Sequence, residues 1–247
     1  LSVPPVRSGL LAEARRLLLE PAGLDDVALS GVLASIHTHE VDFADLYFQY
    51  SRMESWSLEE GIVKAGSFSI DRGVGIRAVH GEKQAFAYSD DISLVALNEA
   101  AVAARAIGRQ CQSAVAALGR VGAAHSLYAP EDPVASLPEE AKVALLERLE
   151  RMARARDPRV AQVMASIAGE YEAVLIARSD GVIAADVRPL VRVSLTVTTP
   201  EASLIDLKRA SAFLSPGLTS GCVFRASLRY ACLISFSVAV FATPSVA

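Results

Sequence analysis

The sequence predicts an α+β fold in which helices pack on one face of a largely antiparallel β-sheet. Helical spacing of apolar residues recurs near the N-terminus and in the middle of the chain, and two blocks rich in alternating β-branched and aromatic residues lie after these helices. The predicted order is helix, helix, four strands, helix, helix, two strands. With 247 residues that are 52% hydrophobic, the chain can bury one large core or two smaller ones.

The first 40 residues predict two helices. Apolar residues recur at helical spacing from Leu10 to Glu20, and the segment Pro21–Gly23 ends this helix. Asp25 or Asp26 can cap a second helix, because a carboxylate accepts hydrogen bonds from the first backbone amides. The apolar stripe of that helix runs from Val27 to about His39.

Alternating aromatic and β-branched residues between positions 42 and 90 predict an antiparallel meander of four strands. Glycine adopts the positive φ that hairpin turns need, so we expect turns at Ala65–Gly66 and at His80–Glu82. The expected strands are Ala44–Ser51, Ser55–Ile62, Ser67–Val79 and Gln84–Ser89.

The second half of the chain predicts two helices and a long hairpin. Asp90 or Asp91 can cap a helix that runs from Ile92 to about Arg109. Proline and acidic residues suit a first helical turn, so Ser136, Pro138, Glu139 and Glu140 predict another helix that ends near Arg156. Strands at Val160–Ser179 and Val182–Thr198 are expected around the turn Ser179–Gly181.

Charge and cysteine content limit the functional classes. The net charge of −4 and the pI near 5.6 provide no basic surface for a phosphate backbone, so direct nucleic-acid binding is not expected. Cys111, Cys222 and Cys232 fit neither a disulfide framework nor paired zinc ligands. Together with an N-terminus that does not resemble a secretory signal, this predicts a cytoplasmic protein.

The composition changes beyond about Thr199. The last acidic residue is Asp206, and no clear helix or strand period follows it. Tyr230–Val246 is nearly uncharged, but it is shorter than the roughly 20 residues of a bilayer span. A membrane helix and a buried terminal strand or helix are two interpretations. We favour a third, in which residues 199–247 are not the native continuation, as after a frame change.

No complete catalytic constellation stands out in the sequence. His37 and His39 would point about 200° apart on a helix, which argues against a shared metal ion. His80, His125 and Cys111 lie beside no recognisable catalytic partner.

Two groups of residues are candidate contacts for a peptide or a partner. Gly73 and Gly75 lie in a predicted strand, where glycine marks a bulge or the close approach of another backbone, so a chain could lie alongside near Arg77. Their Gly-x-Gly lacks the third glycine of a dinucleotide site. Glu54, Glu59 and Glu60 surround Trp56 and precede Lys64; they could line a cleft, but we favour the exposed face of a half-buried strand.

Four segments of the sequence are distinctive: Asp45–Gln49, Glu54–Glu60, Gly73–Ala78 and Gly181–Arg192. Together they resemble the TldD branch of the TldD/PmbA family over roughly residues 10–197. The resemblance implies a cytosolic zinc metallopeptidase, also called a modulator of DNA gyrase, that pairs with a PmbA-type (TldE) subunit. It also implies that small or unfolded peptides are cleaved in a cavity between the subunits.

The zinc ligands of that family come from a His-Glu-x-x-x-His motif in its C-terminal half, and this sequence has no such motif. Its one His-Glu pair, His39–Glu40, is followed by Val41, Asp42, Phe43 and Ala44. The family's glycine-rich segment after Val197 is also missing. We therefore expect a TldD/PmbA-like N-terminal domain at 1–198, an atypical tail at 199–247 and no C-terminal metal-binding domain.

By this hypothesis the chain is a truncated subunit that shapes the substrate chamber and the subunit interface, with no catalytic, cofactor-binding or metal residue of its own. A non-catalytic module that binds DNA gyrase is the alternative. The candidate peptide or interface contacts are Trp56, Glu59, Gly73, Gly75 and Arg77.

Overall fold

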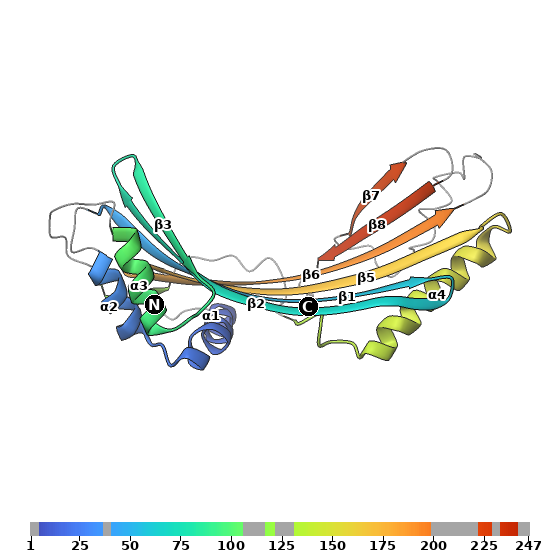
Figure 1. Ribbon diagram of the computed structural model, residues 1–247. Helices are drawn as coiled ribbons and strands as arrows, with labels where there is room; N and C mark the ends of the chain where they lie inside the picture. Colours follow the sequence, from blue (N-terminus) through green and yellow to red (C-terminus); the bar gives the residue numbers. More distant parts are fainter. Residues whose placement is uncertain are drawn as a thin grey trace. The chain divides into compact units, whose positions relative to one another are not determined.

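The fold is α+β, as predicted, with helices on a mostly antiparallel sheet (Figure 1). The computed structural model describes residues 5–36, 41–105, 117–121, 131–198, 222–228 and 233–241. The helices are α1 (Pro5–Leu18), the 3-10 helix η1 (Glu20–Ala22), α2 (Asp26–Ile36), α3 (Leu94–Arg105) and α4 (Glu139–Arg156). The strands are β1 (Phe43–Glu59), β2 (Ile62–His80), β3 (Lys83–Ser89), β4 (Arg120–Val121), β5 (Gln162–Arg178), β6 (Val182–Thr198), β7 (Cys222–Leu228) and β8 (Leu233–Phe241).

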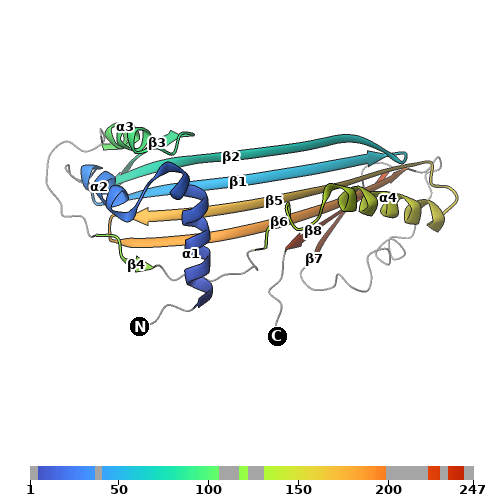
Figure 2. The same ribbon diagram turned by 90° about the horizontal axis from the view of Figure 1, so that it is seen from below.

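The strands form one sheet in the order β3-β2-β1-β5-β6-β8-β7, and the short β4 pairs with β6 in parallel. Four of the strands, β1, β2, β5 and β6, are long (Figure 2). Each of them contributes residues to both of two compact units. Unit 1 comprises residues 1–51, 70–126 and 172–188, and unit 2 comprises 52–69, 127–171 and 189–247.

The core of unit 1 lies between helices α1 to α3 and one face of its part of the sheet. Apolar side chains of α2 and α3 pack there against side chains of β1, β2 and β5. The largest side chains of this core are fully buried, so the helices cover this face of the sheet. These side chains include Leu29, Leu33, Phe48, Ile76, Leu97 and Leu175.

Unit 2 has a smaller core beneath α4. Leu146 of α4 packs with Leu58, Ala165 and Ile167 of the strands. Trp56 is partly buried against this cluster. Since Trp56 and Leu58 are two residues apart in β1, they point to the same face of the strand.

The predicted four-strand meander is wrong in one respect, because β1 is a single strand where two were expected. Its hairpin with β2 turns at Glu60 and Gly61, whose φ angles are 54° and 73°, as a two-residue primed turn requires. Ala65 and Gly66, predicted to form the turn, lie inside β2. The predicted turn before β3 is confirmed, with Gly81 at φ 55°.

Other boundaries were predicted with mixed success. Asp25 caps α2 as expected, because its Oδ1 accepts a hydrogen bond from the amide of Ala28 at 2.8 Å. The cap of α3 was predicted wrongly: Ser93, rather than either aspartate, accepts from the amide of Ala96 at 3.2 Å. Helix α1 begins earlier than predicted, at Pro5. The start of α4 and the hairpin of β5 with β6 are confirmed.

Part of the tail forms strands, although no strand period was found there. β8 pairs antiparallel with β6 from Leu190↔Phe241 to Thr198↔Leu233, and β7 pairs with β8. None of the helices in the described ranges has the length and apolarity that a bilayer crossing requires. His37, His39, Cys111, His125 and the predicted end of the third helix at Arg109 lie outside the described residues.

Candidate functional site

The candidate contacts predicted from the sequence fall into two groups. Gly73, Gly75 and Arg77 lie on β2 in unit 1, whereas Trp56 and Glu59 lie on β1 in unit 2. Each group has its own surroundings and is described separately.

The glycines of β2 lie beneath two aromatic rings of the neighbouring strand. A methyl group added at Gly75 would lie 2.8 Å from Cζ of Phe86, and one added at Gly73 would lie 2.9 Å from the ring of Tyr88. Both distances are too short for a real contact. Aromatic side chains of β3 thus make most of the close contacts at these glycines, together with the carbonyl oxygen of Ser89 at Gly73, whereas the sequence predicted a bulge or the backbone of another chain there. That a chain lies alongside this strand stays a prediction. Phe86 and Tyr88 remain 68% and 66% exposed.

Arg77 is held beside these rings by an ion pair. Its Nε lies 3.3 and 3.2 Å from the two carboxylate oxygens of Asp45, which is only 7% exposed. The hydrogen bond and the charge of Asp45 raise the pKa of Arg77 above its ordinary value. The guanidinium also lies 5.8 Å from the ring centre of Phe43, on which Arg178 stacks at 5.2 Å. Arg77 is thus a fixed and permanently charged group.

A polar network that the sequence did not reveal joins β1, β5 and β6 in unit 1. Gln49 donates to Glu172 at 2.6 Å, and Arg188 pairs with Asp186 at 2.8 Å and with Glu172 at 3.6 Å. Burial raises the pKa of Tyr47, and the charge of Glu172 raises it further, whereas Arg188 opposes this. Tyr47 therefore stays protonated at neutral pH, where it can donate a hydrogen bond but cannot act as a base.

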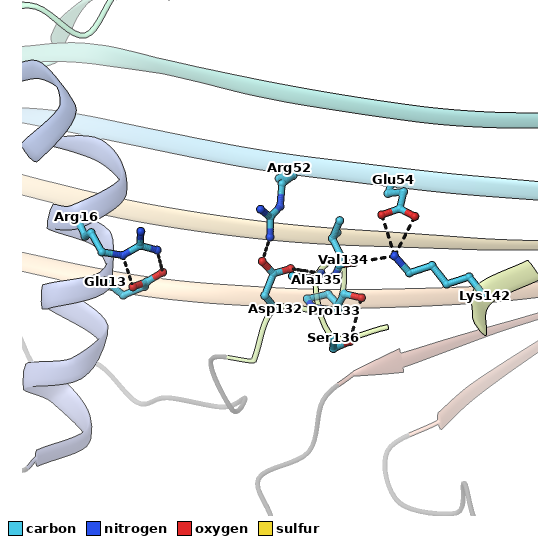
Figure 3. Close-up of polar contacts among 10 residues, drawn as sticks. All are labelled: Glu13, Arg16, Arg52, Glu54, Asp132, Pro133, Val134, Ala135, Ser136 and Lys142. Carbon is cyan, nitrogen blue, oxygen red and sulfur yellow. Dashed lines mark hydrogen bonds and ion pairs between the residues drawn. The ribbon is translucent and has the colours of Figure 1, made fainter. Parts of the chain in front are cut away.

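In unit 2 a buried ion pair connects α4 with β1 (Figure 3). Nζ of Lys142 lies 2.9 and 2.8 Å from the two carboxylate oxygens of Glu54 and 2.7 Å from the carbonyl oxygen of Val134. The side chains of Lys142 and Glu54 are 7% and 11% exposed. Trp56 donates its indole N–H to the same carboxylate. We refer to Glu54, Trp56, Val134 and Lys142 as the Lys142 cluster.

Burial by itself raises the pKa of Glu54. The hydrogen bonds from Lys142 and Trp56, together with the charges of Lys142 and Arg52, outweigh that effect, and the pKa of Glu54 lies below its ordinary value of 4.5. All three ammonium protons of Lys142 have acceptors. The Glu54 carboxylate is therefore ionised at neutral pH, and the hydrogen bonds of the cluster are internally satisfied, which is typical of a structural pair.

The Lys142 cluster borders a small cavity of about 70 Å³, which Pro133, Leu137, Ile167, Gly169 and Val191 also line. This is enough for a few water molecules, each of which needs roughly 10–15 Å³, but it is too small for a peptide side chain with its backbone. The cavity sits under the turn at residues 132–136, where Asp132 accepts from the amides of Val134 and Ala135 at 2.9 and 3.2 Å. Arg52 pairs with Asp132 and fixes the turn to β1.

The interpretation of the acidic residues near Trp56 as an exposed face is wrong for Glu54, which is almost buried. Lys142, which neutralises it, is distant in the sequence and could not be identified as its partner. Glu59 accepts a hydrogen bond from Gln162, and Glu60 pairs with Arg154 at 2.7 Å. These contacts join β1 to β5 and the turn after β1 to α4, so Trp56 and Glu59 both take part in packing within unit 2.

Among the described residues, no group of three or more His, Cys, Asp or Glu side chains could hold a metal ion. The residues in the described ranges thus do not provide a site that fits the zinc ion implied by the family resemblance. The constellations above bind and position backbone segments. None of them joins a nucleophile to a base.

Comparison with family models gives two matches. Domain 1 of the PmbA/TldA metallopeptidases matches residues 44–108, and the central domain of the same metallopeptidases matches residues 132–225. The second match extends past Thr198. Together they cover most of the strands and helices described above.

Curated relatives agree with these matches. A protein of Haemophilus influenzae named Metalloprotease TldD homolog is 44% identical over 194 residues, which are 78% of this chain and 40% of that protein. A protein of the same name from Buchnera aphidicola subsp. Schizaphis graminum is 38% identical over 66% of this chain and 34% of its own length. The chain thus spans about 40% or less of the length of these relatives.

Solved structures share the fold at low identity. A proposed modulator of a DNA gyrase from Thermotoga maritima has a TM-score of 0.52 at 14% identity, over 65% of this chain and 37% of its own. TldE from Thermococcus kodakarensis has a TM-score of 0.51 at 16% identity, over 70% of this chain and 40% of its own. At these identities the likeness concerns the fold alone.

Proposed function

The chain belongs to the PmbA/TldD metallopeptidase family, and from this premise we propose that it is the N-terminal part of a TldD-type zinc metallopeptidase that cleaves small or unfolded peptides. The observation that carries this proposal is the 44% identity to a Metalloprotease TldD homolog over 194 residues, which are 78% of this chain. The sequence has no His-Glu-x-x-x-His motif. The hydrolytic site of the whole protein would therefore be formed outside the residues present here.

The part of this chain would be to shape the substrate chamber and the interface with a TldE-type subunit. Two features support this role. The described residues make internally paired polar clusters that join neighbouring elements, as a scaffold requires. TldE from Thermococcus kodakarensis shares the fold, which is consistent with two similar subunits that assemble together.

Metal content and proteolysis of the purified chain test the proposal. We expect no stoichiometric zinc by mass spectrometry and no cleavage of an unfolded casein substrate by the chain alone. The full-length TldD relative, mixed with its TldE-type subunit, is the positive control, and its cleavage should stop on chelation. Stoichiometric zinc with chelator-sensitive cleavage by the isolated chain would refute the assignment of the metal site to another part of the protein.

The name of the Thermotoga maritima protein supports a second candidate, a module that binds DNA gyrase. A pull-down with the immobilised chain distinguishes the peptidase scaffold from the gyrase-binding module. Retention of the TldE-type subunit supports the peptidase scaffold. Retention of purified gyrase, with the TldE-type subunit left in the flow-through, would support the gyrase module instead.

The division of the chain at Thr198 remains a prediction, and we propose that the native sequence departs from this one in the tail. Because the central-domain match runs to residue 225, the decisive segment lies beyond it. Peptide mass spectrometry of the naturally produced protein would settle the matter. Recovery of Leu233–Phe241 would show that the tail is native, and a His-Glu-x-x-x-His motif in another reading frame after the codon for Thr198 would show that it is not.

A further inference from the structure

The outer edge of β3 combines two features of a binding surface for an extended chain. β3 is the terminal strand of the sheet, so among the described strands none pairs with its outer side. A terminal strand presents backbone N–H and C=O groups that have no partner in the sheet. Two large aromatic side chains, Phe86 and Tyr88, lie along the same strand at alternate positions and share one face.

Glycines of β2 hold these rings in place. The strands pair with Gly75 opposite Tyr88 and Arg77 opposite Phe86. Because Gly73 and Gly75 have no Cβ, the rings lie directly against the backbone of β2, with contacts that a methyl group would prevent. On the opposite face of β3, Ala85 and Ala87 pack against the core of unit 1. The backbone of β2 thus supports one side of the two rings, and much of their remaining surface is exposed to solvent.

The size of this surface favours a peptide over a folded partner. A fully buried aromatic side chain covers roughly 150–250 Å², and the two rings are 68% and 66% exposed. Together they offer roughly 200–330 Å², whereas a stable interface between folded proteins buries about 800 Å² on each partner. A second copy of this chain could form the same backbone hydrogen bonds along β3, but the two rings would bury too little area for a stable interface between folded proteins. An extended segment needs only those hydrogen bonds and contacts for its alternate side chains.

We infer that the outer edge of β3 binds an extended segment of an unfolded polypeptide, which adds to the sheet as a further strand. Apolar side chains at alternate positions of that segment lie against Phe86 and Tyr88, and the fixed charge of Arg77 borders the rings. The inference rests on the proposed function only for the source of the peptide. It places a substrate contact on β3, apart from Trp56 and Glu59.

Fluorescence anisotropy with the purified chain tests this site. The probe is a short fluorescein-labelled peptide that alternates leucine with threonine between terminal lysines. We expect the double variant Phe86→Ser with Tyr88→Ser to bind it about tenfold more weakly, which corresponds to about 1.4 kcal/mol. The matched control is Val27→Ser, which removes another exposed apolar side chain of unit 1, 78% exposed on α2, and should leave binding unchanged. Circular dichroism confirms that each variant is folded.

A second probe tests the strand pairing itself. The same peptide with N-methyl groups at alternate residues cannot donate the hydrogen bonds of an added strand, and we expect its binding to fall to background. Equal binding of the methylated and unmethylated peptides would overturn the inference, as would unchanged binding by the double variant. Self-association of the chain that the double variant abolishes would identify a second copy as the occupant and overturn it too. Binding needs neither metal nor TldE-type subunit, so its failure and the failure of the proposed function are distinguishable.

Discussion

The buried pair of Lys142 and Glu54 makes a quantitative prediction about stability. Lys142→Met leaves the Glu54 carboxylate without its cation in a position that is only 11% exposed. Removing one partner of a buried pair typically costs about 3–5 kcal/mol. The unpaired Glu54 can instead take up a proton. Protonating a carboxyl group of ordinary pKa 4.5 at pH 7 costs 2.5 units, or about 3.4 kcal/mol at 1.36 kcal/mol per unit, which limits the loss of stability. We therefore expect a loss of about 3 kcal/mol.

The double variant Lys142→Met with Glu54→Gln should lose less than either single variant. No charge then remains buried, and the glutamine oxygen still accepts the indole N–H of Trp56. We expect a cost of about 1 kcal/mol, so the two substitutions should be strongly non-additive. Glu147→Gln, which removes an exposed pair with Arg151 on the same helix, is the control and should change stability by about 0.5 kcal/mol or less.

Urea unfolding measures these differences, with the fluorescence of Trp56 as the probe. Trp56 is the only tryptophan of the chain and lies in the Lys142 cluster, so its signal reports the unfolding of unit 2. Circular dichroism provides a second probe that the substitutions do not touch directly. Additive effects of the two substitutions, or a loss below about 1 kcal/mol for Lys142→Met, would show that water reaches the pair and that our reading of its burial is wrong.

Three further predictions concern acid stability, the glycines and a helix cap. Folding lowers the pKa of Glu54, so the ionised carboxylate contributes its full stabilisation above about pH 4.5, and this stabilisation is lost as the pH falls through the folded-state pKa. The urea midpoint of the wild type should therefore fall more steeply towards pH 3 than that of the variant with both Lys142→Met and Glu54→Gln. Gly75→Ala should cost about 1 kcal/mol, the low end for an added methyl group, because the exposed ring of Phe86 can move aside. Gly31→Ala, in open space on α2, should be neutral or stabilising by thermal denaturation. Asp25→Ala should lower stability by about 0.5–2 kcal/mol in the same assay, and no change would show that the cap is replaceable.

Local signals in the sequence predicted the elements that local chemistry determines. The turn Ser179–Gly181 correctly predicted the hairpin of β5 and β6, because Gly181 has the positive φ, 84°, that such a turn needs. Pro138 and the glutamates after it correctly predicted the start of α4. Asp25 correctly predicted the start of α2, where its side chain accepts a hydrogen bond from a residue three positions away.

The single long strand β1 could not be predicted, because its continuity depends on distant residues. Arg52 and Glu54 interrupt the apolar alternation and resemble a break between strands. In the fold Asp132 pairs with Arg52, and Lys142, 88 positions from Glu54, pairs with that carboxylate, so both charges are neutralised within the strand. A charge can lie in a half-buried part of a strand where the fold supplies a partner for it.

The difference between local signals and contacts with distant residues also explains how much of the candidate site was predictable. Gly73 and Gly75 pointed to a close approach, since glycine within a strand is costly unless something needs the space. What fills that space is set by the register of β2 with β3, which brings Tyr88 and Phe86 over the glycines. The sequence could therefore single out the glycines, whereas only the pairing shows that they lie beneath the aromatic rings. At the peptide site that we infer on β3, substitutions at the glycines would therefore act on binding through the rings.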